Sequence, residues 1–386
     1  MPDRGCDAHA VRRTLIVTND FPPRVGGIQS FVHSLAIRQP EGSVVVYASG
    51  HAGSAAFDGD QPFPVIRHPT GLLLPTPSAR RRIVAALVEH RCTAVWFGAA
   101  APLGLLAPYL RRAGAERIVA STHGHEVGWV RLPVGRQAMR RIGSRCDIVT
   151  YLGEYTRGRL ARALGAATTL RRLAPGVDTQ YFHPGVEGKT VRARYGLDDR
   201  AVIVCVSRLV PRKGQDVLIR ALPRIRQQAP DAALLLVGRP NRARFLRWLQ
   251  LLAGREGVAD HVIFAGGVPG DQLPEYYAAG DVFAMPCRTR RLGLDVEGLG
   301  IVYLEASAVA RPVIAGESGG APEAVREGES GYVVNGRDPT AVAAHVVGML
   351  GDAAERDRLG RAGRRWVEQA WTWDVAAAQL QDLLQG

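Results

Sequence analysis

The chain has 386 residues, 46% of them hydrophobic, and carries 49 Lys and Arg against 36 Asp and Glu, a formal net charge of +13. This length suffices for two domains of ordinary size, and no apolar run approaches the roughly 18 residues that a membrane-spanning helix needs. The five cysteines are scattered and form no Cys-x-x-Cys pair, so the sequence indicates neither a disulfide framework nor a zinc site.

The positive charge is concentrated in the first half of the chain. Residues 1–180 hold 23 Lys and Arg against 12 Asp and Glu, whereas residues 181–386 hold 26 against 24. This surplus predicts an anionic partner for the first half, such as nucleic acid, a membrane surface or a phosphorylated substrate. The first residues lack the apolar core of a signal peptide, so we expect a protein of the reducing cytoplasm.

Short apolar strands alternate with helical segments in the first half. We expect strands at residues 14–18, 44–48, 65–67, 94–97, 117–121 and 147–151, and helices at residues 28–37, 78–90, 102–113, 134–142 and 155–164. Such alternation is typical of a parallel sheet that has helices on both faces and binds ligands at the carboxyl ends of its strands. Gly26 and Gly27 follow the first strand, and His123 follows the fifth, so all three are expected at that edge.

Three segments of the first half could bind phosphate or metal. Gly26 and Gly27 stand between a strand and a helix, which can cradle a phosphate, although a plain loop gives the same pattern. Asp58-Gly59-Asp60 has a form that holds divalent cations in many nucleotide-sugar enzymes, but its neighbours favour a surface turn. No further His or Cys lies at ligand spacing near His123-Gly124-His125-Glu126, so a metal is the weaker interpretation there.

One expected helix of the first half begins with three arginines. Arg80, Arg81 and Arg82 precede an apolar run from Ile83 to Val88. Such a helix can lie on an anionic membrane, or it can be an ordinary surface helix with a solvated arginine turn. The surplus of positive charge in this half favours the membrane.

The second half repeats the alternation after a linker that begins at Phe182. Strands are expected at residues 201–206, 233–237, 262–265, 281–285 and 313–315, and a last helix at residues 371–384. Two such domains joined by a linker imply a cleft, which is a favoured place for ligands. Arg208 and Lys213 follow the first of these strands and precede a helix, so they can neutralise a diphosphate; a solvated basic loop is the alternative.

The chain is organised around residues 288–325, and above all around two carboxylates. Glu297 is followed by Gly298-Leu299-Gly300, and a helix is expected over residues 300–310 with Glu305 inside it. The glycines allow close approach of a ligand, and the helix start offers unpaired N–H groups to an anion. Glu305 can accept hydrogen bonds from a ribose diol, and Glu297 can bind the hydroxyls of a sugar. Gly-x-Gly before a helix is common, so this is a hypothesis.

The combination of Gly26-Gly27, Arg208 with Lys213, and Glu297-x7-Glu305 resembles the retaining GT-B glycosyltransferases of the glycogen-synthase-like group. Residues 17–24, 122–129 and 206–216 are closest to one family in it, the GDP-mannose-dependent phosphatidylinositol monomannoside mannosyltransferases of mycobacteria and relatives. The likeness covers nearly the whole chain, and the segments around Asn19 and His123 are its specific part.

The resemblance implies an α/β, GT-B protein with two Rossmann-like domains facing each other across a cleft. Residues 1–180 would bind acceptor and membrane, residues 181–370 would bind the nucleotide sugar, and residues 371–386 would form a helix that returns to the first domain. The implied reaction moves mannose from GDP-mannose to phosphatidylinositol monomannoside, an anionic phosphoinositide glycolipid, and forms the alpha-1,6-linked dimannoside. The enzyme would be cytoplasmic and peripheral on the inner face of the cell membrane.

The resemblance also implies roles for single residues, with His123, Arg208, Lys213 and Glu297 as the catalytic set. Arg208 and Lys213 would hold the diphosphate, Glu305 the ribose, Glu297 the mannose and Val268 the guanine. Backbone amides of Gly298, Leu299, Gly300, Ile301 and Val302 would contact mannose and phosphate, Gly26 and Gly27 would contact phosphate, and His123 would lie between donor sugar and acceptor. The membrane would be bound by Arg80, Arg81 and Arg82.

No metal or other cofactor is expected, because cations and a helix start can supply the same electrostatic stabilisation. Retention usually suggests a carboxylate nucleophile, but the sequence offers none at the expected first-domain position. The family is instead assigned a same-face substitution in which the leaving phosphate takes the acceptor proton.

Three alternatives remain at the level of the sequence. A related retaining glycosyltransferase with another nucleotide sugar, or another lipid or polysaccharide acceptor, would share the donor residues. A nucleotide-sugar epimerase can use the same fold and needs no acceptor. A nucleic-acid-binding protein fits the charge, but the aromatic content of 6% and the absence of a stacking or finger motif argue against it.

Overall fold

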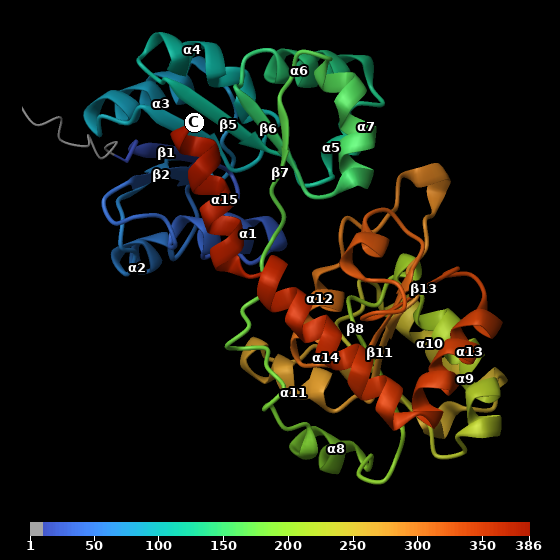
Figure 1. The fold of residues 1–386 in the computed structure, drawn as a ribbon. Coiled ribbons are helices and arrows are strands. Elements are labelled where there is room, and N and C mark those ends of the chain that lie inside the picture. Colours follow the sequence, from blue (N-terminus) through green and yellow to red (C-terminus); the bar gives the residue numbers. More distant parts are fainter. Residues whose placement is uncertain (1–10) are drawn as a thin grey trace, which may run out of the picture. The chain divides into compact units, whose positions relative to one another are not determined.

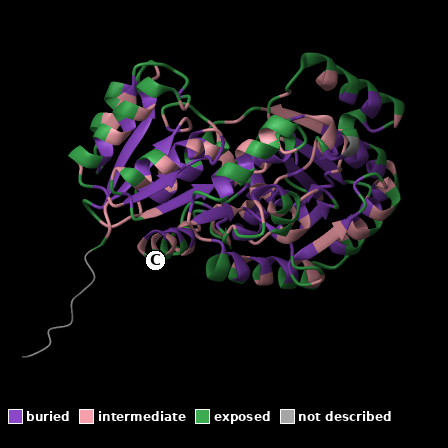
Figure 2. Cartoon of the chain, turned by 90° about the horizontal axis from the view of Figure 1, so that it is seen from above, coloured by how far each residue is buried: buried purple, intermediate pink, exposed green. Residues whose placement is uncertain are grey.

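The computed structural model describes residues 11–386, except for the side chain of Leu292, and these residues form two compact units (Figure 1). Unit 1 is the chain up to Pro175 together with Trp373–Gly386, and unit 2 is Gly176–Thr372. In both units, buried strands lie between helices whose outer sides are exposed (Figure 2).

Unit 1 is built on a seven-stranded parallel sheet in the order β3-β2-β1-β4-β5-β6-β7. Its strands are β1 (Thr14–Thr18), β2 (Val44–Ser49), β3 (Val65–His68), β4 (Ala94–Phe97), β5 (Arg117–Ser121), β6 (Ile148–Tyr151) and β7 (Leu170–Arg172). Its α-helices are α1 (Gly27–Ala36), α2 (Ser54–Gly59), α3 (Pro77–Glu89), α4 (Ala107–Arg112), α5 (Glu126–Trp129), α6 (Pro133–Gly143), α7 (Glu154–Leu164) and α15 (Trp373–Gln385).

The strands of unit 1 are apolar at nearly every position because helices cover both faces of the sheet. Leu15 and Val17 of β1 point into one apolar cluster with residues of α3, α4, α6 and α7, and Ile16 points into a second on the opposite face. Helix α15 supplies Leu380 and Leu384 to the second cluster and lies against α1. The last helix of the chain therefore completes the core of unit 1 (Figure 1).

Unit 2 has a six-stranded parallel sheet in the order β10-β9-β8-β11-β12-β13, the strand order of a dinucleotide-binding fold. Its strands are β8 (Val202–Val206), β9 (Ala233–Val237), β10 (Val262–Gly266), β11 (Val282–Met285), β12 (Val313–Gly316) and β13 (Gly331–Val334). Its α-helices are α8 (Lys189–Tyr195), α9 (Gln215–Gln228), α10 (Ala243–Arg255), α11 (Leu273–Ala278), α12 (Ile301–Ala308), α13 (Pro339–Gly351) and α14 (Ala353–Ala370). The expected α/β class with two Rossmann-like domains is confirmed.

The structure corrects several expected elements. Edge strands β7 and β13 were not expected, because Leu-Arg-Arg is mostly polar, and Gly-Tyr-Val-Val begins with glycine directly after the polar segment Gly328-Glu329-Ser330. The helix expected at residues 102–113 begins as a 3₁₀ turn, Leu103–Leu106, before α4. Asp58 and Gly59 lie in the last turn of the short helix α2, and Asp60 is its C-cap, so this segment is not a plain turn.

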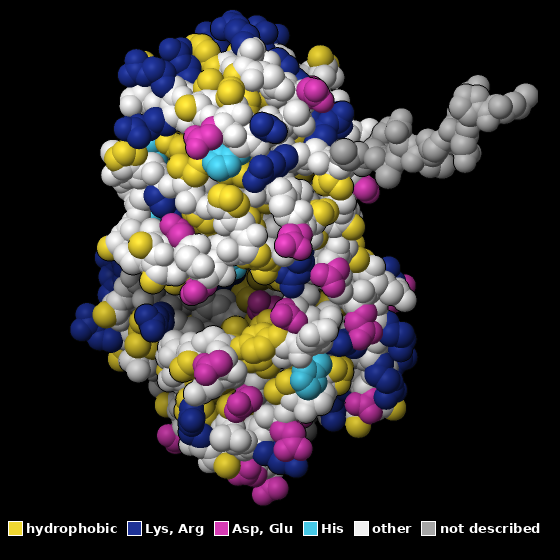
Figure 3. Space-filling model, turned by 90° about the vertical axis from the view of Figure 1, so that its left-hand side faces the viewer, with side chains coloured by type: hydrophobic (Ala, Val, Ile, Leu, Met, Phe, Trp, Pro, Cys, Tyr) yellow, Lys and Arg dark blue, Asp and Glu magenta, His cyan; other side chains and the backbone are white. Residues whose placement is uncertain are grey.

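The apolar side of the helix with the arginine start is in the core. Ala79, Ile83, Ala86 and Leu87 of α3 are buried against the sheet, so the apolar run from Ile83 to Val88 is largely unavailable to a membrane. Basic side chains nevertheless gather on the upper end of unit 1 in Figure 3. None of the helices of residues 11–386 is long and apolar enough to span a bilayer.

Arg67 of β3 anchors the loop that follows β1. Its guanidinium forms a two-oxygen ion pair with Asp58 at 2.7–3.2 Å and donates to the carbonyls of Ser49 and Pro22. It also lies 5.5 Å from the centre of the Phe21 ring. Because both charged side chains are only about 15% exposed, one residue holds helix α2, strand β2 and residues 21–22 together.

We expect Arg67→Ala to destabilise unit 1 by about 2–4 kcal/mol, because it leaves the Asp58 carboxylate and two carbonyls partly buried without their donor. Chemical denaturation followed by far-UV circular dichroism measures this. Arg24→Ala is the control, since Arg24 is exposed and makes no ion pair among the described residues. Equal stabilities of the two variants would contradict the anchoring role.

Candidate active site

The segment after β8 turns sharply and buries a lysine. Residues Pro211–Lys213 form a 3₁₀ turn, and Gly214 adopts φ 83° before α9 begins. Lys213 is only 7% exposed, and its Nζ lies 2.6 Å from Oε2 of Glu297, which is 6% exposed. At this distance the two groups form a direct ion pair. The turn therefore delivers a buried cation to a buried carboxylate.

Glu297 is held by its backbone as well as by its charge. Its amide donates to Oγ of Ser318 at 3.2 Å, and Nε of Arg212 lies 3.6 Å from its carboxylate. Gly319 has φ 59°, and a Cβ there would lie 1.9 Å from the Glu297 carbonyl oxygen. Only glycine permits this approach, so the turn after β12 fixes the position of Glu297.

Helix α12 starts directly beside Glu297 without a capping side chain. Its N-cap, Gly300, has φ 80° and ψ 64°, and a Cβ on it would lie 2.5 Å from the ring of Tyr303. No side chain caps the helix, so its first N–H groups, those of Ile301 and Val302, are open to an anion. Gly298 and Leu299 complete the bend between Glu297 and the helix.

Glu305 lies one turn into α12 and is half-buried. Tyr277 of α11 donates a short hydrogen bond to its Oε2 and is its one donor among the described residues. Burial raises the pKa of Glu305, and the Tyr277 hydrogen bond partly offsets this rise. The other carboxylate oxygen can accept from a ligand hydroxyl, as the ribose hypothesis requires.

The remaining candidates of unit 2 lie at neighbouring strand ends. Arg208, two residues after the end of β8, is exposed and makes no ion pair within residues 11–386. Val268 is in the turn after β10 and is half-buried. Since the carboxyl ends of parallel strands share one edge, the unit 2 candidates gather at the edge where ligands of such sheets bind.

In unit 1, the two glycines lie at the start of α1. Gly26 precedes the helix in extended conformation and Gly27 is its first residue, again with no capping side chain. A Cβ on Gly26 would lie 2.1 Å from Oε1 of Gln29, whose Nε2 donates to Asp20. The glycine thus leaves room for a polar pair at the carboxyl end of β1.

His123 follows β5 and has a defined hydrogen-bond partner. Its Nε2 lies 2.6 Å from the carbonyl oxygen of Gly98. A carbonyl can only accept, so Nε2 carries the proton and Nδ1 of the neutral ring is the free acceptor. Burial lowers the pKa of His123, while the charge of Glu126 works in the opposite direction. The ring packs edge-on against Phe31, with centroids 5.1 Å apart.

The other polar groups of the segment around His123 stabilise its local structure. Glu126 is fully buried, accepts from the backbone amide of His123 and lies 3.4 Å from Nε2 of His125. Asp58 is occupied by Arg67. In the part of the chain that the structure describes, no three His, Cys, Asp or Glu side chains cluster as a metal site would require.

Sequence reasoning missed the residues that position this site. Arg212 shares Glu297 with Lys213, Tyr277 holds Glu305, and Ser318 holds the backbone of Glu297. Tyr277 and Ser318 come from other elements, so spacing could not reveal them. Arg212 is next to Lys213 in the sequence, and this proximity to a predicted site residue was the one signal that could have identified it.

This arrangement suits a nucleotide sugar. Cations after β8 and the open start of α12 can stabilise a diphosphate, while the carboxylates of Glu297 and Glu305 can accept from sugar and ribose hydroxyls. The four cysteines of residues 11–386 are buried thiols, and burial raises the pKa of Cys287, beside Glu297, to about 11. We therefore expect no cysteine thiolate to act as a nucleophile at this edge of the sheet.

Comparisons with known proteins agree with this chemistry. The family model "Glycosyl transferases group 1" matches residues 189–366, and "Glycosyltransferase Family 4" matches residues 25–181. The GDP-mannose-dependent alpha-(1-6)-phosphatidylinositol monomannoside mannosyltransferase of Mycolicibacterium smegmatis is 52% identical over 379 residues, covering 96% of this chain and 98% of the relative. The GDP-mannose-dependent monoacylated alpha-(1-6)-phosphatidylinositol monomannoside mannosyltransferase of Corynebacterium glutamicum is 45% identical, covering 97% of this chain and 98% of the relative.

Among solved structures, Anabaena HepE in complex with UDP matches with a TM-score of 0.79 at 19% identity, covering 96% of this chain and 99% of that one. Sucrose-phosphate synthase of Thermosynechococcus elongatus matches with a TM-score of 0.75 at 22% identity, covering 96% and 98%. At these identities the likeness concerns the fold, which is GT-B. The chain is a glycosyltransferase and belongs to the family of the GDP-mannose-dependent phosphatidylinositol monomannoside mannosyltransferases.

Proposed function

We propose that this chain transfers mannose from GDP-mannose to phosphatidylinositol monomannoside and forms the alpha-1,6-linked dimannoside with retention. The observation that carries the proposal is the buried Lys213–Glu297 pair beside the uncapped start of α12. The names of relatives at 45–52% identity, which include this donor and acceptor, support the choice of substrates.

Donor binding would draw on the charges at the edge of the unit 2 sheet. Lys213 and Arg208 would neutralise the diphosphate, Glu297 would accept from the mannose hydroxyls, and Glu305 would accept from the ribose. Lys213 and Glu297 lie 2.6 Å apart and neutralise each other. This pairing keeps both charged groups in place before the donor arrives, so little reorganisation is needed on binding.

The chemical step would depend on electrostatics. As the bond between mannose and phosphate breaks, negative charge grows on the diphosphate, next to Lys213, Arg208 and the first amides of α12. Fixed donors aimed at developing charge typically contribute about 10²–10³ in rate each. In the proposed same-face substitution the acceptor oxygen bonds to the mannose carbon as the bond to phosphate breaks, and the leaving phosphate takes the acceptor proton. His123, with Nδ1 free as an acceptor, is proposed to contact the sugar or the acceptor.

The acceptor end of the reaction would take place at an anionic membrane, with the enzyme peripheral on its inner face. The surplus of positive charge in residues 1–180 supports attraction of this half to acidic lipids. On α3, Arg81 and Arg82 are exposed, whereas Arg80 lies over the ring of Tyr109 at 4.4 Å. Because the apolar side of α3 is buried, the proposed attachment by this helix is electrostatic and not insertive.

The direct test supplies radiolabelled GDP-mannose and phosphatidylinositol monomannoside to the purified chain. We expect label in a dimannosylated lipid, and release of that label by an alpha-1,6-specific mannosidase. Conversion of the donor without acceptor would favour an epimerase, and preference for UDP-glucose would favour another donor; either result contradicts the proposal.

Replacing Arg208 or Lys213 by Ala should lower kcat about 10²–10³-fold, because each removes a cation that faces the leaving diphosphate. Lys213→Ala also leaves Glu297 buried without its closest cation, so its melting temperature must be measured too. The double variant Lys213→Ala with Glu297→Gln should recover stability without recovering activity. Arg224→Ala is the control, because Arg224 is an exposed residue of α9 outside the site. Wild-type turnover in Arg208→Ala would remove that residue from the mechanism.

Activity should survive EDTA, because the proposed mechanism assigns the stabilisation of the diphosphate to protein cations. Initial rates are measured on enzyme dialysed against chelator, with and without added Mn²⁺ or Mg²⁺. Loss of activity that either ion restores would reopen Asp58 and Asp60 as metal ligands.

Replacing Arg80, Arg81 and Arg82 together by Ser should weaken binding to phosphatidylinositol vesicles by about two orders of magnitude and leave GDP-mannose affinity intact. Each basic residue near an anionic surface contributes roughly 1 kcal/mol, which salt screens over about 8 Å. Vesicle co-sedimentation at rising salt measures the change. Unchanged sedimentation of the triple variant would place the docking surface elsewhere.

A further inference from the structure

Unit 2 contains a basic pocket, most of whose lining the proposed donor chemistry does not explain. It has a volume of about 870 Å³, and its walls come from the loop after β8, the start of α10 and the loop after β11. The lining includes neither Glu305 nor Val268, and it shares two residues with the proposed donor site: Arg208, and Arg212, whose Nε lies 3.6 Å from Glu297. The volume is that of a pocket for a drug-sized ligand.

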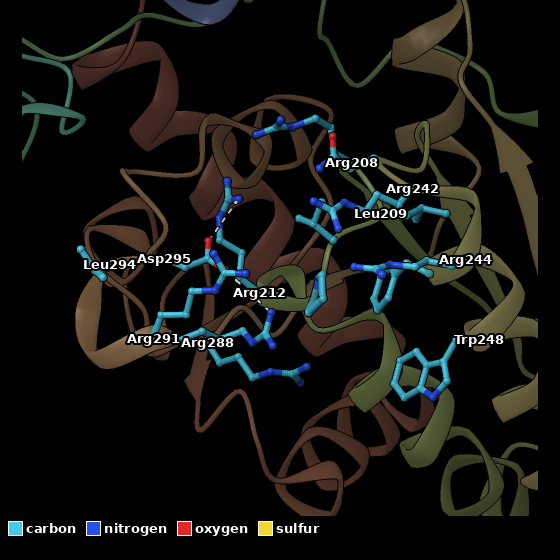
Figure 4. A pocket seen from close by; sticks show the side chains of 15 residues that line it. Arg208, Leu209, Arg212, Arg242, Arg244, Trp248, Arg288, Arg291, Leu294 and Asp295 are labelled. Atoms are coloured by element: carbon cyan, nitrogen blue, oxygen red, sulfur yellow. Dashed lines mark ion pairs between the residues drawn. The ribbon is translucent and has the colours of Figure 1, made fainter. Parts of the chain in front are cut away.

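Arginine dominates the lining, from two sides of the pocket (Figure 4). The seven arginines are Arg208, Arg212, Arg242, Arg244, Arg288, Arg290 and Arg291, and the one acidic residue among the lining side chains is Asp295. Unit 2 as a whole is nearly balanced, because residues 181–386 hold 26 basic and 24 acidic side chains. The pocket therefore concentrates charge that the rest of the unit neutralises.

Three of these arginines are held by carboxylates. Arg288 forms a two-oxygen ion pair with Asp216 at 2.9 Å, and Asp295 lies 3.7 Å from Arg212 and 3.9 Å from Arg290. The other four, Arg208, Arg242, Arg244 and Arg291, have no carboxylate within ion-pair distance in residues 11–386. Nε of Arg212 is buried and faces the Glu297 carboxylate at 3.6 Å, so this arginine is shared with the proposed donor site. The arginines without a carboxylate partner leave the pocket positively charged, which favours an anionic ligand.

Apolar side chains frame the same pocket. The rings of Phe245 and Trp248 on α10 stack with centroids 5.5 Å apart and 22° between their planes. Trp248 is 37% exposed and Leu294 is 60% exposed, and they lie on opposite sides of the pocket in Figure 4. Tryptophan with an apolar body and an N–H group suits the boundary between water and lipid. A free inorganic anion would gain nothing from these apolar side chains, so they favour a ligand that has an apolar part.

We propose that this pocket docks the phosphorylated head group of an anionic phospholipid, with guanidinium groups on the phosphate and Trp248 and Leu294 against the interfacial part of the lipid. Guanidinium groups bind phosphate in bidentate geometry, which matches the excess of arginine in the pocket. The proposal rests on the proposed function, because a lipid acceptor brings the enzyme to a bilayer. It gives unit 2 a membrane contact of its own.

The test compares two double variants of the full chain that remove the same charge. Arg242→Ala with Arg244→Ala alters the pocket, and Arg247→Ala with Arg255→Ala alters two exposed arginines of α10 that do not line it. Vesicles of phosphatidylcholine with and without phosphatidylinositol are floated with each protein, in the absence of donor and acceptor. We expect binding to phosphatidylinositol vesicles to fall roughly tenfold or more in the pocket variant and less than threefold in the control.

Two further measurements test whether the loss of vesicle binding is specific to this pocket. GDP-mannose affinity should be the same in both variants, since neither touches the proposed donor residues. Soluble inositol 1-phosphate should bind the wild type at least tenfold more weakly than the vesicles do. An equal loss in both double variants, no loss in either, or inositol 1-phosphate binding as tight as vesicle binding would overturn the proposal. Mannosyl transfer enters none of these readouts, so failure of the proposed function would be seen separately.

Discussion

The structure of the proposed donor site depends on one buried ion pair, between Lys213 and Glu297. Burying two charges costs more free energy than their mutual attraction recovers, unless other groups also stabilise them. Here Arg212 stands 3.6 Å from the same carboxylate, Ser318 accepts from the Glu297 amide, and Gly319 lets the backbone of the next turn touch Glu297. Three strand ends must be in register for this pair to form, so the sheet order of unit 2 is a condition for the site.

Much of the fold followed from the pattern of the sequence. Strands buried on both faces are apolar throughout, and β1, β4, β8 and β9 were predictable for that reason. Edge strand β7 was not, because Leu170–Arg172 is held by its pairing with β6 and not by an apolar pattern. The sequence revealed the apolar run of α3 but not whether it faces the core or a membrane. An apolar stripe has the same helical period in both cases.

The site was predictable in its residues and not in their pairing. The chain order placed Lys213 after one strand and Glu297 after another, but only the fold shows that they neutralise each other. Tyr277 could not have been assigned to Glu305, because it lies 28 residues away on a different helix. The aromatic pair of α10 and the arginines after β11 belong to one pocket, although more than 40 residues separate Trp248 from Leu294 in the sequence.

Two kinds of positive charge can be distinguished in this protein by what surrounds them. The arginines at the start of α3 project from a helix whose apolar residues are buried, so any attraction they exert is long-ranged and screened by salt. The arginines after β8, β9 and β11 line a pocket next to exposed Trp248 and Leu294, and Asp216 and Asp295 hold three of them in place. The first arrangement can bring a protein to an anionic surface, whereas the second can recognise a particular phosphate on it. In the proposed reaction at a bilayer, the long-range attraction would act before the recognition of the phosphate.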